Sequence, residues 1–191
     1  QKDLSRTFAF GMPVRAFVDK KAVKSADKRW NWVRRGAPLI LEIGPRDAAG
    51  GQVTFMRRDA LRDGDKIASQ AMARDAFVDA ASGLLTEIQG ALYAEAKERL
   101  ESSITPIASF ADLEAYFGAA AEDDDAASAF KGWARVSWAK PTGEALEAVA
   151  TRLKALKLTI RNAPQTQPSS FGACIFTGAP GVEEVLVARS Y

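Results

Sequence analysis

The stretch "LILEIGPRDAAGGQVTFMRRD", residues 39–59, decides how the first half of this 191-residue chain folds. Two mainly apolar runs, residues 38–44 and 51–58, have the length and composition of β-strands. The residues between them include a proline and glycine, which are typical of turns. The second run ends in an arginine pair. We therefore predict two neighbouring strands that carry basic side chains at their ends.

The flanking segments extend this pattern in both directions. Residues 1–13 contain a glycine and a proline near their end and are typical of the end of a helix. Residues 14–19 alternate between apolar and polar, which predicts a strand. Residues 25–36 predict a short helix that stops at a glycine. Residues 59–66 predict a turn, which is tightest at its Asp-Gly step.

Residues 69–100 carry the strongest periodic signal in the chain. Apolar side chains recur at helical spacing and no proline interrupts them. The members of this stripe are Phe77, Val78, Ala81, Leu84, Leu85, Ile88, Ala91, Leu92 and Ala96. The spacing predicts one long amphipathic helix, and a core-facing stripe explains it without a cofactor.

A second, smaller module is expected after residue 104. Ser109 followed by Asp112 is a capping signature for a short helix, and residues 142–156 predict a second helix. The acidic run at residues 122–128 predicts a solvated loop. Four predicted strands complete the module, namely residues 131–139, 157–161, 172–178 and 183–191. The chain is therefore expected to divide into an α/β unit, 1–104, and an α+β module, 105–191.

The composition excludes several kinds of chemistry. The chain has no histidine, and its one cysteine, Cys174, lies in an apolar segment without a base to activate it. The single cysteine also excludes an internal disulfide. No phosphate-binding loop, dinucleotide-binding motif or membrane-spanning apolar run is present. The acidic run Asp123–Asp125 lacks the spaced ligands of a calcium loop. By itself the chain does not resemble a catalyst. Its function is therefore expected to be the binding of another molecule.

The basic residues are concentrated in the first third of the chain. The net charge is +2, but residues 1–66 hold 15 Lys and Arg against 8 Asp and Glu. Basic side chains neutralise phosphates, and aromatic rings such as Trp30 stack on unpaired bases; for Trp32 we expect core packing instead. Nucleic-acid binding is therefore one hypothesis, and an ordinary solvated surface is the other. The candidate RNA-binding residues are Lys28, Arg34, Arg35, Arg46, Asp47, Arg57, Arg58 and Arg62.

An ordered series of motifs resembles prolyl-tRNA synthetase of the archaeal and eukaryotic type. The pattern K-x-x-x-W-x-x-x-G-x-P begins at Lys28, and G-P-R-D and R-R-D follow at residues 44–47 and 57–59. Further matches are "LTEIQGALYAEAKE", "SFADLEAYF", "LTIRNAP" and the terminal "VLVARSY". The resemblance covers nearly the whole chain, and the order of the matches makes it specific.

This resemblance implies an anticodon-binding domain followed by a C-terminal module. The expected fold is an α/β domain with a mixed sheet, residues 1–104, whose first strand lies upstream of Gln1, then the α+β module at 105–191. The parent enzyme would be a cytoplasmic proline–tRNA ligase that uses ATP and Mg²⁺. Its partners would be proline tRNA, its own class II catalytic domain and a second subunit bound through that domain. This part of it would hold the anticodon loop and carry no catalytic residue, cofactor or membrane anchor.

The chain departs from the family pattern at two places. Where the family reads guanines with an acidic residue and an arginine, this chain has Val33 and Ile40, although Asp47 remains. The four slots that hold a structural zinc in many relatives are Ala139, Glu144, Cys174 and Thr177. One thiolate and at best one carboxylate do not make a tetrahedral site, so no zinc is expected.

Apolar packing must then hold the C-terminal module together, and Tyr191 is expected at an interdomain contact. The expected core residues are Trp133, Val136, Trp138, Ile160, Ile175, Phe176, Val185 and Leu186. Two other functions stay open. One is a synthetase-like paralogue that no longer reads tRNA and serves as an interaction or regulatory module. The other is a single-stranded RNA binder that keeps phosphate affinity without base selectivity.

Overall fold

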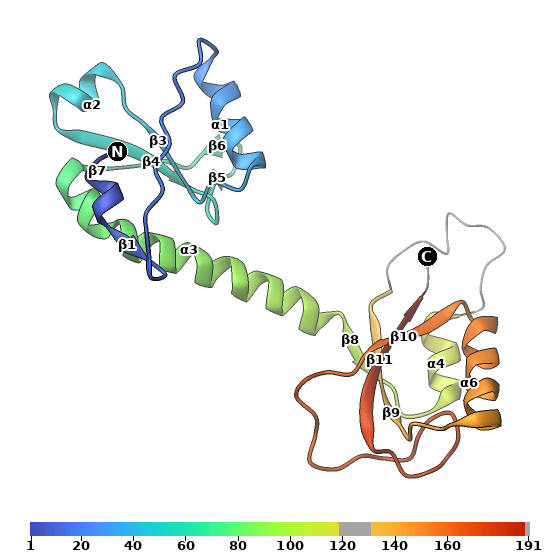
Figure 1. Cartoon of the computed structure of the whole chain (residues 1–191). Coiled ribbons are helices and arrows are strands. Elements are labelled where there is room, and N and C mark those ends of the chain that lie inside the picture. The colour runs from blue at the N-terminus through green and yellow to red at the C-terminus, as the bar shows by residue number, and fades with distance from the viewer. Residues whose placement is uncertain (119–130, 190–191) are drawn as a thin grey trace. The chain divides into compact units, whose positions relative to one another are not determined.

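The computed structural model describes residues 1–118 and 131–189 and divides into two compact units (Figure 1). Unit 1 comprises residues 1–97 and unit 2 comprises residues 98–191. The acidic run at 122–128 and the terminal Tyr191 lie outside the described residues. Within the described part of the chain, no helix combines the length and apolar character needed to cross a membrane.

Secondary structure covers most of both units. The elements up to the long helix are η1 (Leu4–Arg6), β1 (Phe8–Ala9), β2 (Met12–Pro13), α1 (Ser25–Arg34), β3 (Leu39–Glu42), α2 (Pro45–Ala49), β4 (Gln52–Arg57), β5 (Arg62–Asp63), β6 (Lys66–Ile67), β7 (Gln70–Ala73) and α3 (Arg74–Ser102). The later elements are β8 (Ile104–Pro106), α4 (Phe110–Phe117), β9 (Trp133–Trp138), α6 (Gly143–Ala155), β10 (Leu158–Asn162) and β11 (Glu183–Arg189).

The two strands predicted from residues 39–59 form the centre of unit 1. β3 and β4 pair antiparallel, with Leu39 opposite Arg57, and β7 pairs with the other edge of β4. Phe55 of β4 is fully buried and packs on Phe77 of α3, with 5.1 Å between the ring centroids. The connection between β3 and β4 is not the predicted turn. It is the short helix α2, because Pro45 suits the first helical turn and the side chain of Asp47 accepts a hydrogen bond from the backbone at Gly44.

The prediction for the first nineteen residues was wrong. Residues 1–13 form η1 and a small hairpin, β1–β2, instead of a helix end. Phe10 and Gly11 both have positive φ, 53° and 74°, and this conformation closes a two-residue hairpin turn. Residues 14–19 are not a strand, since none of the described strands pairs with them. They run as an extended segment held by side-chain contacts to α1.

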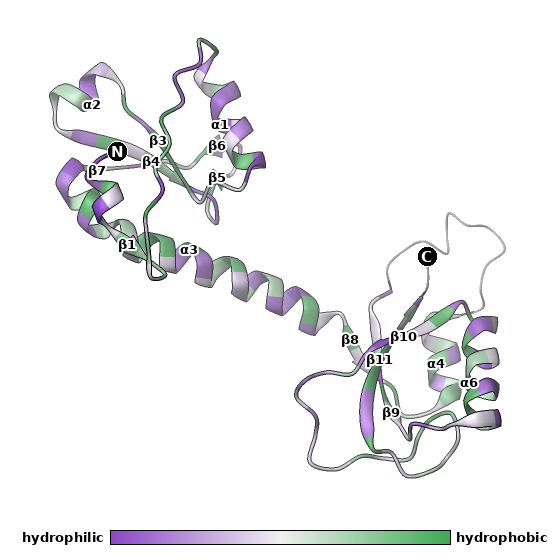
Figure 2. Cartoon of the chain, viewed as in Figure 1, coloured by the Kyte–Doolittle hydropathy of each residue, from purple (hydrophilic) through white to green (hydrophobic). Residues whose placement is uncertain are grey.

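The predicted long helix is confirmed as α3, although it begins at Arg74 because β7 takes the preceding four residues. Three members of the predicted apolar stripe, Phe77, Ala81 and Ile88, are buried. Past Ile88 the helix is mostly exposed, and Ala91 and Ala96 are not core residues. Figure 2 shows hydrophobic and hydrophilic residues alternating along the whole helix. The burial of its first half anchors the helix to the sheet of unit 1.

Unit 2 contains the mixed sheet. Its strand order is β10-β11-β9-β8, and β8 runs parallel to β9 whereas the other pairs are antiparallel. The described strands of unit 1, by contrast, all pair antiparallel. The short helix α4 begins at the predicted cap, where the hydroxyl of Ser109 accepts from the backbone N–H of Asp112 at 3.1 Å.

The core of unit 2 consists largely of the predicted apolar residues. Val136, Trp138, Phe176 and Val185 are buried in one cluster, and Ile160 and Ile175 pack against it. Leu186 is also buried and Trp133 is half-buried. The cluster is completed by Leu113, Phe117, Ala134, Val149, Leu153, Leu158, Cys174 and Val187.

The predicted strand at residues 172–178 is a tight turn with a single β-bridge, between Ala173 and Pro180. The backbone N–H of Cys174 donates to Ala179, and that of Gly178 donates back to Cys174. Gly178 has a φ of 74°, which reverses the chain too soon for a strand to form.

Arg57, at the end of β4, connects the sheet of unit 1 to α3. Its guanidinium group donates to both carboxylate oxygens of Asp59, at 3.1 and 2.8 Å, and to Glu87 of α3 at 2.8 Å. The side chains of Arg57 and Asp59 are only 19% and 9% exposed, so solvent screens their ion pair weakly. The hydrogen bonds from Arg57 lower the pKa of Asp59 below its ordinary value of 3.8, against the opposing effect of burial.

This pair predicts a pH-dependent loss of stability on replacing Asp59 by Asn. The substitution removes a bidentate charge-assisted contact and should cost unit 1 about 1–3 kcal/mol at neutral pH. Because the pKa of Asp59 is lowered by folding, its stabilising effect is present above the ordinary value of 3.8 and is lost as the pH falls through the lower folded value. The difference between parent and variant should therefore shrink below about pH 4.

Urea unfolding followed through the amide NMR signals of β3 and β4 measures this difference for unit 1 alone. Asp63→Asn is the matched control, because Asp63 is exposed in the β5–β6 hairpin and its replacement should leave stability unchanged. Equal stability of the Asp59→Asn variant and the parent at pH 7 would show that the ion pair contributes nothing.

Candidate nucleic-acid interface

The antiparallel register of β3 and β4 brings two basic segments of the sequence to the same end of the sheet. α1 leads into the start of β3, and β4 ends opposite that start. The guanidinium group of Arg58 donates to the backbone carbonyl of Val33 in α1, and the backbone N–H of Arg58 donates to Pro38 at 2.9 Å. The chain after β4 is thereby fastened against the end of α1.

Two arginines lie over the tryptophan rings of α1. The guanidinium carbon of Arg62 is 5.4 Å from the ring centroid of Trp30, and that of Arg35 is 5.2 Å from the ring centroid of Trp32. Both distances fit cation–π contacts. Arg35 and Arg62 are exposed, whereas the two tryptophans are half-buried. Each arginine is therefore held above an aromatic ring and still faces solvent.

Trp32 packs against the N-terminal segment, but it is half-buried and is not part of the apolar core that was expected for it. Its indole N–H donates to a carboxylate oxygen of Asp19 at 2.9 Å, and its ring lies 4.9 Å from that of Phe17. Hydrogen bonds from the backbone of Lys21 and from Trp32 lower the pKa of Asp19. Lys28 adds a contact from its ammonium group to the carbonyl of Asp19 at 3.3 Å. Together these contacts hold the extended N-terminal segment on α1.

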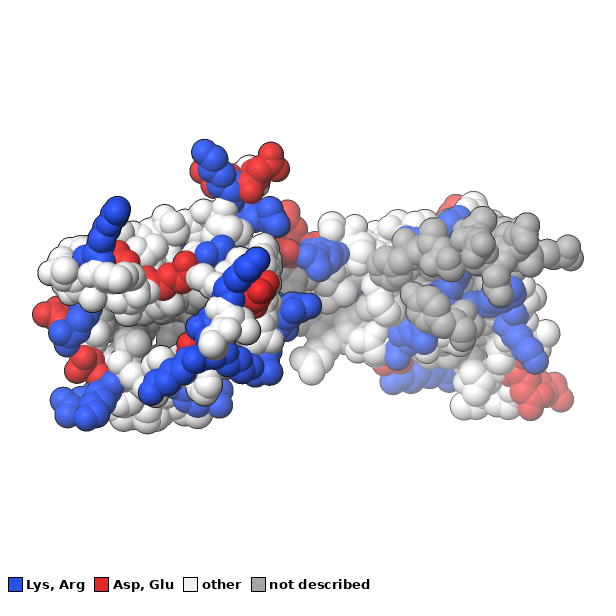
Figure 3. Space-filling model, turned by 90° about the horizontal axis from the view of Figure 1, so that it is seen from above, with Lys and Arg blue, Asp and Glu red and all other residues white. Residues whose placement is uncertain are grey.

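Five of the eight predicted site residues are on α1 or contact it, and we call them the α1 basic group. They are Lys28, Arg34, Arg35, Arg58 and Arg62. Figure 3 shows Lys and Arg side chains at several places on the visible face of unit 1, with Asp and Glu side chains among them. Among the described contacts, no acidic side chain forms an ion pair with any of the five.

The other three predicted residues, Arg46, Asp47 and Arg57, do not belong to the α1 basic group. Arg57 is engaged by Asp59 and Glu87. Arg46 and Asp47 belong to α2, which joins β3 to β4 at the opposite end of the strand pair. The carboxylate of Asp47 accepts from the backbone of Gly44 at 2.8 Å and from the hydroxyl of Thr54 at 3.3 Å. Asp47 therefore caps α2, a role that its position three residues after Gly44 could have suggested.

Trp30 is the residue that the predicted site set omitted. It is half-buried beneath Arg62, and its position among basic residues was the available signal. The two positions that depart from the family pattern are apolar in the structure as well. Val33 is half-buried in α1, and Ile40 lies in β3 opposite Met56. Neither side chain can form a hydrogen bond to a base edge.

The four positions at which the family resemblance would place zinc ligands can also be located in unit 2. Cys174 is 2% exposed, and its thiol lies beside Thr177 and the backbone of Ala139. Burial raises the pKa of Cys174, but hydrogen bonds from Thr177, Phe176 and Ala139 outweigh this effect and lower it. Glu144 is exposed in the first turn of α6. The described residues contain no cluster of three or more side chains of metal-ligating type.

The chain is similar in sequence to known proline–tRNA ligases. A proline–tRNA ligase from Sphingomonas elodea is 50% identical over 100% of this chain, and one from Sphingopyxis alaskensis is 48% identical over 96% of it. The chain spans about a third of the length of these relatives, 36% and 33% respectively. No protein-family model matches the chain.

The fold also has a solved counterpart. The prolyl-tRNA synthetase of Cryptosporidium parvum, crystallised with L-proline and AMP, superposes with a TM-score of 0.68 over 93% of this chain and 34% of its own, at 21% sequence identity. At this identity the superposition shows a similar fold only. The relationship to proline–tRNA ligases rests on the sequence identities of 50% and 48%. From end to end, the chain therefore corresponds to about a third of a prolyl-tRNA synthetase, as its motifs predict.

Proposed function

We propose that this chain is the C-terminal portion of a proline–tRNA ligase and that unit 1 binds the anticodon stem-loop of proline tRNA. The α1 basic group is the observation that carries the proposal. It consists of five cationic side chains, from segments up to 34 residues apart in the sequence, that belong to α1 or its end or contact it, and none of them forms an ion pair with a described acidic side chain. The relatives support the same reading, because they match the chain over its whole length.

Within this proposal, the cationic and aromatic groups have separate tasks. Arg34, Arg35 and Arg58 neutralise phosphates of the loop, a contribution that does not depend on the base sequence. The Arg62–Trp30 pair offers a flat guanidinium group on which an unpaired base can stack. Arg57 fixes the end of β4 and so positions Arg58. Arg46 lies at the far end of the strand pair and can reach only a different part of the RNA.

The remaining steps would belong to the rest of the parent protein. We propose that its class II catalytic domain activates proline with ATP and Mg²⁺ and transfers it to the tRNA. It would act in the cytoplasm, as a homodimer formed through that domain. The present chain would contribute neither a catalytic residue nor a cofactor ligand. Its contribution to the reaction would be to hold the anticodon end of the substrate.

Titration of proline tRNA against the chain, at two salt concentrations, tests the proposal. We expect Arg62→Gln and Arg35→Gln both to weaken binding, and Arg35→Gln to reduce the slope of log affinity against log salt by about 0.7, the value for one lost phosphate contact on a single strand. Trp30→Leu should weaken binding without changing the salt slope, because stacking releases few counterions. Fluorescence anisotropy of labelled tRNA measures both quantities.

Arg6→Gln is the matched control. Arg6 is exposed in η1, outside α1, β4 and the β5–β6 hairpin, so its replacement should change neither affinity nor slope. An unrelated tRNA should bind more weakly than proline tRNA. If Arg35→Gln and Arg62→Gln bind as tightly as the parent chain, the α1 basic group is not the RNA site.

A second function is favoured by Val33, Ile40 and Asp47. Val33 and Ile40 are apolar and cannot form hydrogen bonds to base edges. The carboxylate of Asp47 already accepts hydrogen bonds within unit 1, from Gly44 and Thr54, so it is not free to select a base. On this reading the chain either binds RNA without selectivity or belongs to a paralogue that binds no tRNA. Equal affinity for both tRNAs with a steep salt slope would support the first, and binding to neither would support the second.

We further propose that unit 2 folds without zinc. Its Cys174 is enclosed by Thr177 and backbone groups, and a continuous apolar cluster surrounds it. Metal analysis of the purified chain should give less than stoichiometric zinc, and excess EDTA should leave the midpoint of thermal unfolding unchanged. A structural zinc normally contributes directly to folding, so its removal would lower that midpoint sharply. Such a drop would refute the proposal.

A further inference from the structure

One edge of the unit 2 sheet is open. β10 pairs with β11, and the described residues contain no strand on its other side. A strand with a free edge presents unpaired backbone N–H and C=O groups, which are suited to hydrogen bonding with another extended chain. This edge belongs to unit 2 and has no part in the proposed RNA site.

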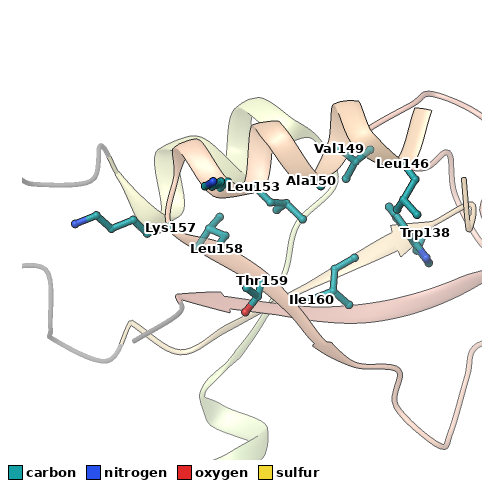
Figure 4. Close-up of a pocket in the computed structure, with 10 residues that line it drawn as sticks. Trp138, Leu146, Val149, Ala150, Leu153, Lys157, Leu158, Thr159 and Ile160 are labelled. Atoms are coloured by element: carbon teal, nitrogen blue, oxygen red, sulfur yellow. The ribbon is translucent and has the colours of Figure 1, made fainter. Parts of the chain in front are cut away.

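An apolar cleft of about 530 Å³ lies along this strand, between α6 and β10. Its floor is core, since Trp138, Val149, Leu153 and Leu158 are at most 7% exposed. Its rim is accessible, and Leu146 on α6 is 44% exposed. Figure 4 shows Leu146, Val149 and Leu153 reaching from the helix toward β10, with Leu158 and Ile160 facing them. Side chains therefore do not fill the whole space between α6 and the sheet next to the free edge of β10.

The exposed side of this cleft has an apolar end and a cationic end. Leu146, Ala150 and Lys154 follow each other at four-residue spacing on α6, so they form one stripe of the helix, and all three line the cleft. Lys157 lies just beyond the end of α6, and none of the described residues that line the cleft is acidic. Arg161 adds a cation further along β10.

We propose that β10 and the adjoining cleft bind an extended acidic peptide, which adds a strand to the sheet. Its backbone pairs with the free edge of β10, whose five residues set the length of the paired segment. Alternate side chains of an added strand point to the same face, so apolar ones enter the cleft beneath Leu146 and Ala150. Carboxylates of the peptide meet Lys154.

A peptide accounts for more of these features than a small apolar acid does. A small acid could fill the cleft and contact a lysine, but it would leave the backbone groups of the β10 edge unused. An added strand uses the edge, the apolar stripe and the cations together. Both strand pairing and side-chain pockets are combined in this way in known cases of peptide binding to a sheet edge.

The test uses the ¹⁵N-labelled chain and two capped heptapeptides, Glu-Val-Glu-Val-Glu-Val-Glu and the same peptide with Lys in place of Glu. The acidic peptide should shift amide signals of β10 and of α6 in a saturable way, and the basic peptide should not. Leu146→Glu and Lys154→Glu should each weaken binding about tenfold, which corresponds to roughly 1.4 kcal/mol. Both positions are exposed, so the variants should keep the parent's thermal midpoint.

Lys20→Glu is the control for the charge change, because Lys20 is exposed and belongs to unit 1, whereas the cleft belongs to unit 2, and the replacement of Lys20 should leave peptide affinity unchanged. Octanoate serves as the small apolar acid. The proposal is overturned if neither peptide shifts these signals, if both do so equally, or if octanoate alone shifts them. It is also overturned if the signals move with protein concentration alone, since a second copy of the chain would then occupy the edge.

Discussion

The antiparallel pairing of β3 with β4 is the constraint on which the architecture of unit 1 depends. With Leu39 opposite Arg57, the residues that enter β3 and the residues that leave β4 must lie at the same end of the sheet. α1 and the β5–β6 hairpin are therefore neighbours, and Arg62 of the hairpin lies over the ring of Trp30 in α1 although the two are far apart in the sequence. The same pairing sends α2 to the opposite end, and Arg46 and Asp47 with it.

The basic residues of α1, of the end of β4 and of the β5–β6 hairpin are not equivalent, and their contacts divide them into two classes. Arg57 is held by two carboxylates and Arg29 by Glu42, so both stabilise the fold. Arg35 and Arg62 rest on tryptophan rings, which orient a cation without neutralising it. In the proposed function, recognition of RNA depends on the second class, and stabilisation of unit 1 depends on the first.

Much of this arrangement could be predicted from the sequence, because it follows from local signals. The strands β3 and β4, the helix α1 and the long α3 follow from periodicity and stop residues. Residues 14–19 could not be assigned correctly, because alternation predicts a strand only where a neighbouring strand is available. The local pattern also does not show that Arg57 is occupied, since Glu87 is 30 residues away in the sequence. The role of Asp47 was missed because G-P-R-D was interpreted as a turn and not as the start of a helix.

The most direct test of this account is an NMR footprint of RNA on the labelled chain. A stem-loop carrying the proline anticodon is added to the ¹⁵N-labelled protein, and the shifted amides are assigned. The account predicts shifts at the end of α1 and across residues 57–62, with α2 and the strands of unit 2 unaffected. Shifts centred on α2, or spread evenly over both units, would contradict the claim that the β3–β4 register builds the RNA-binding surface.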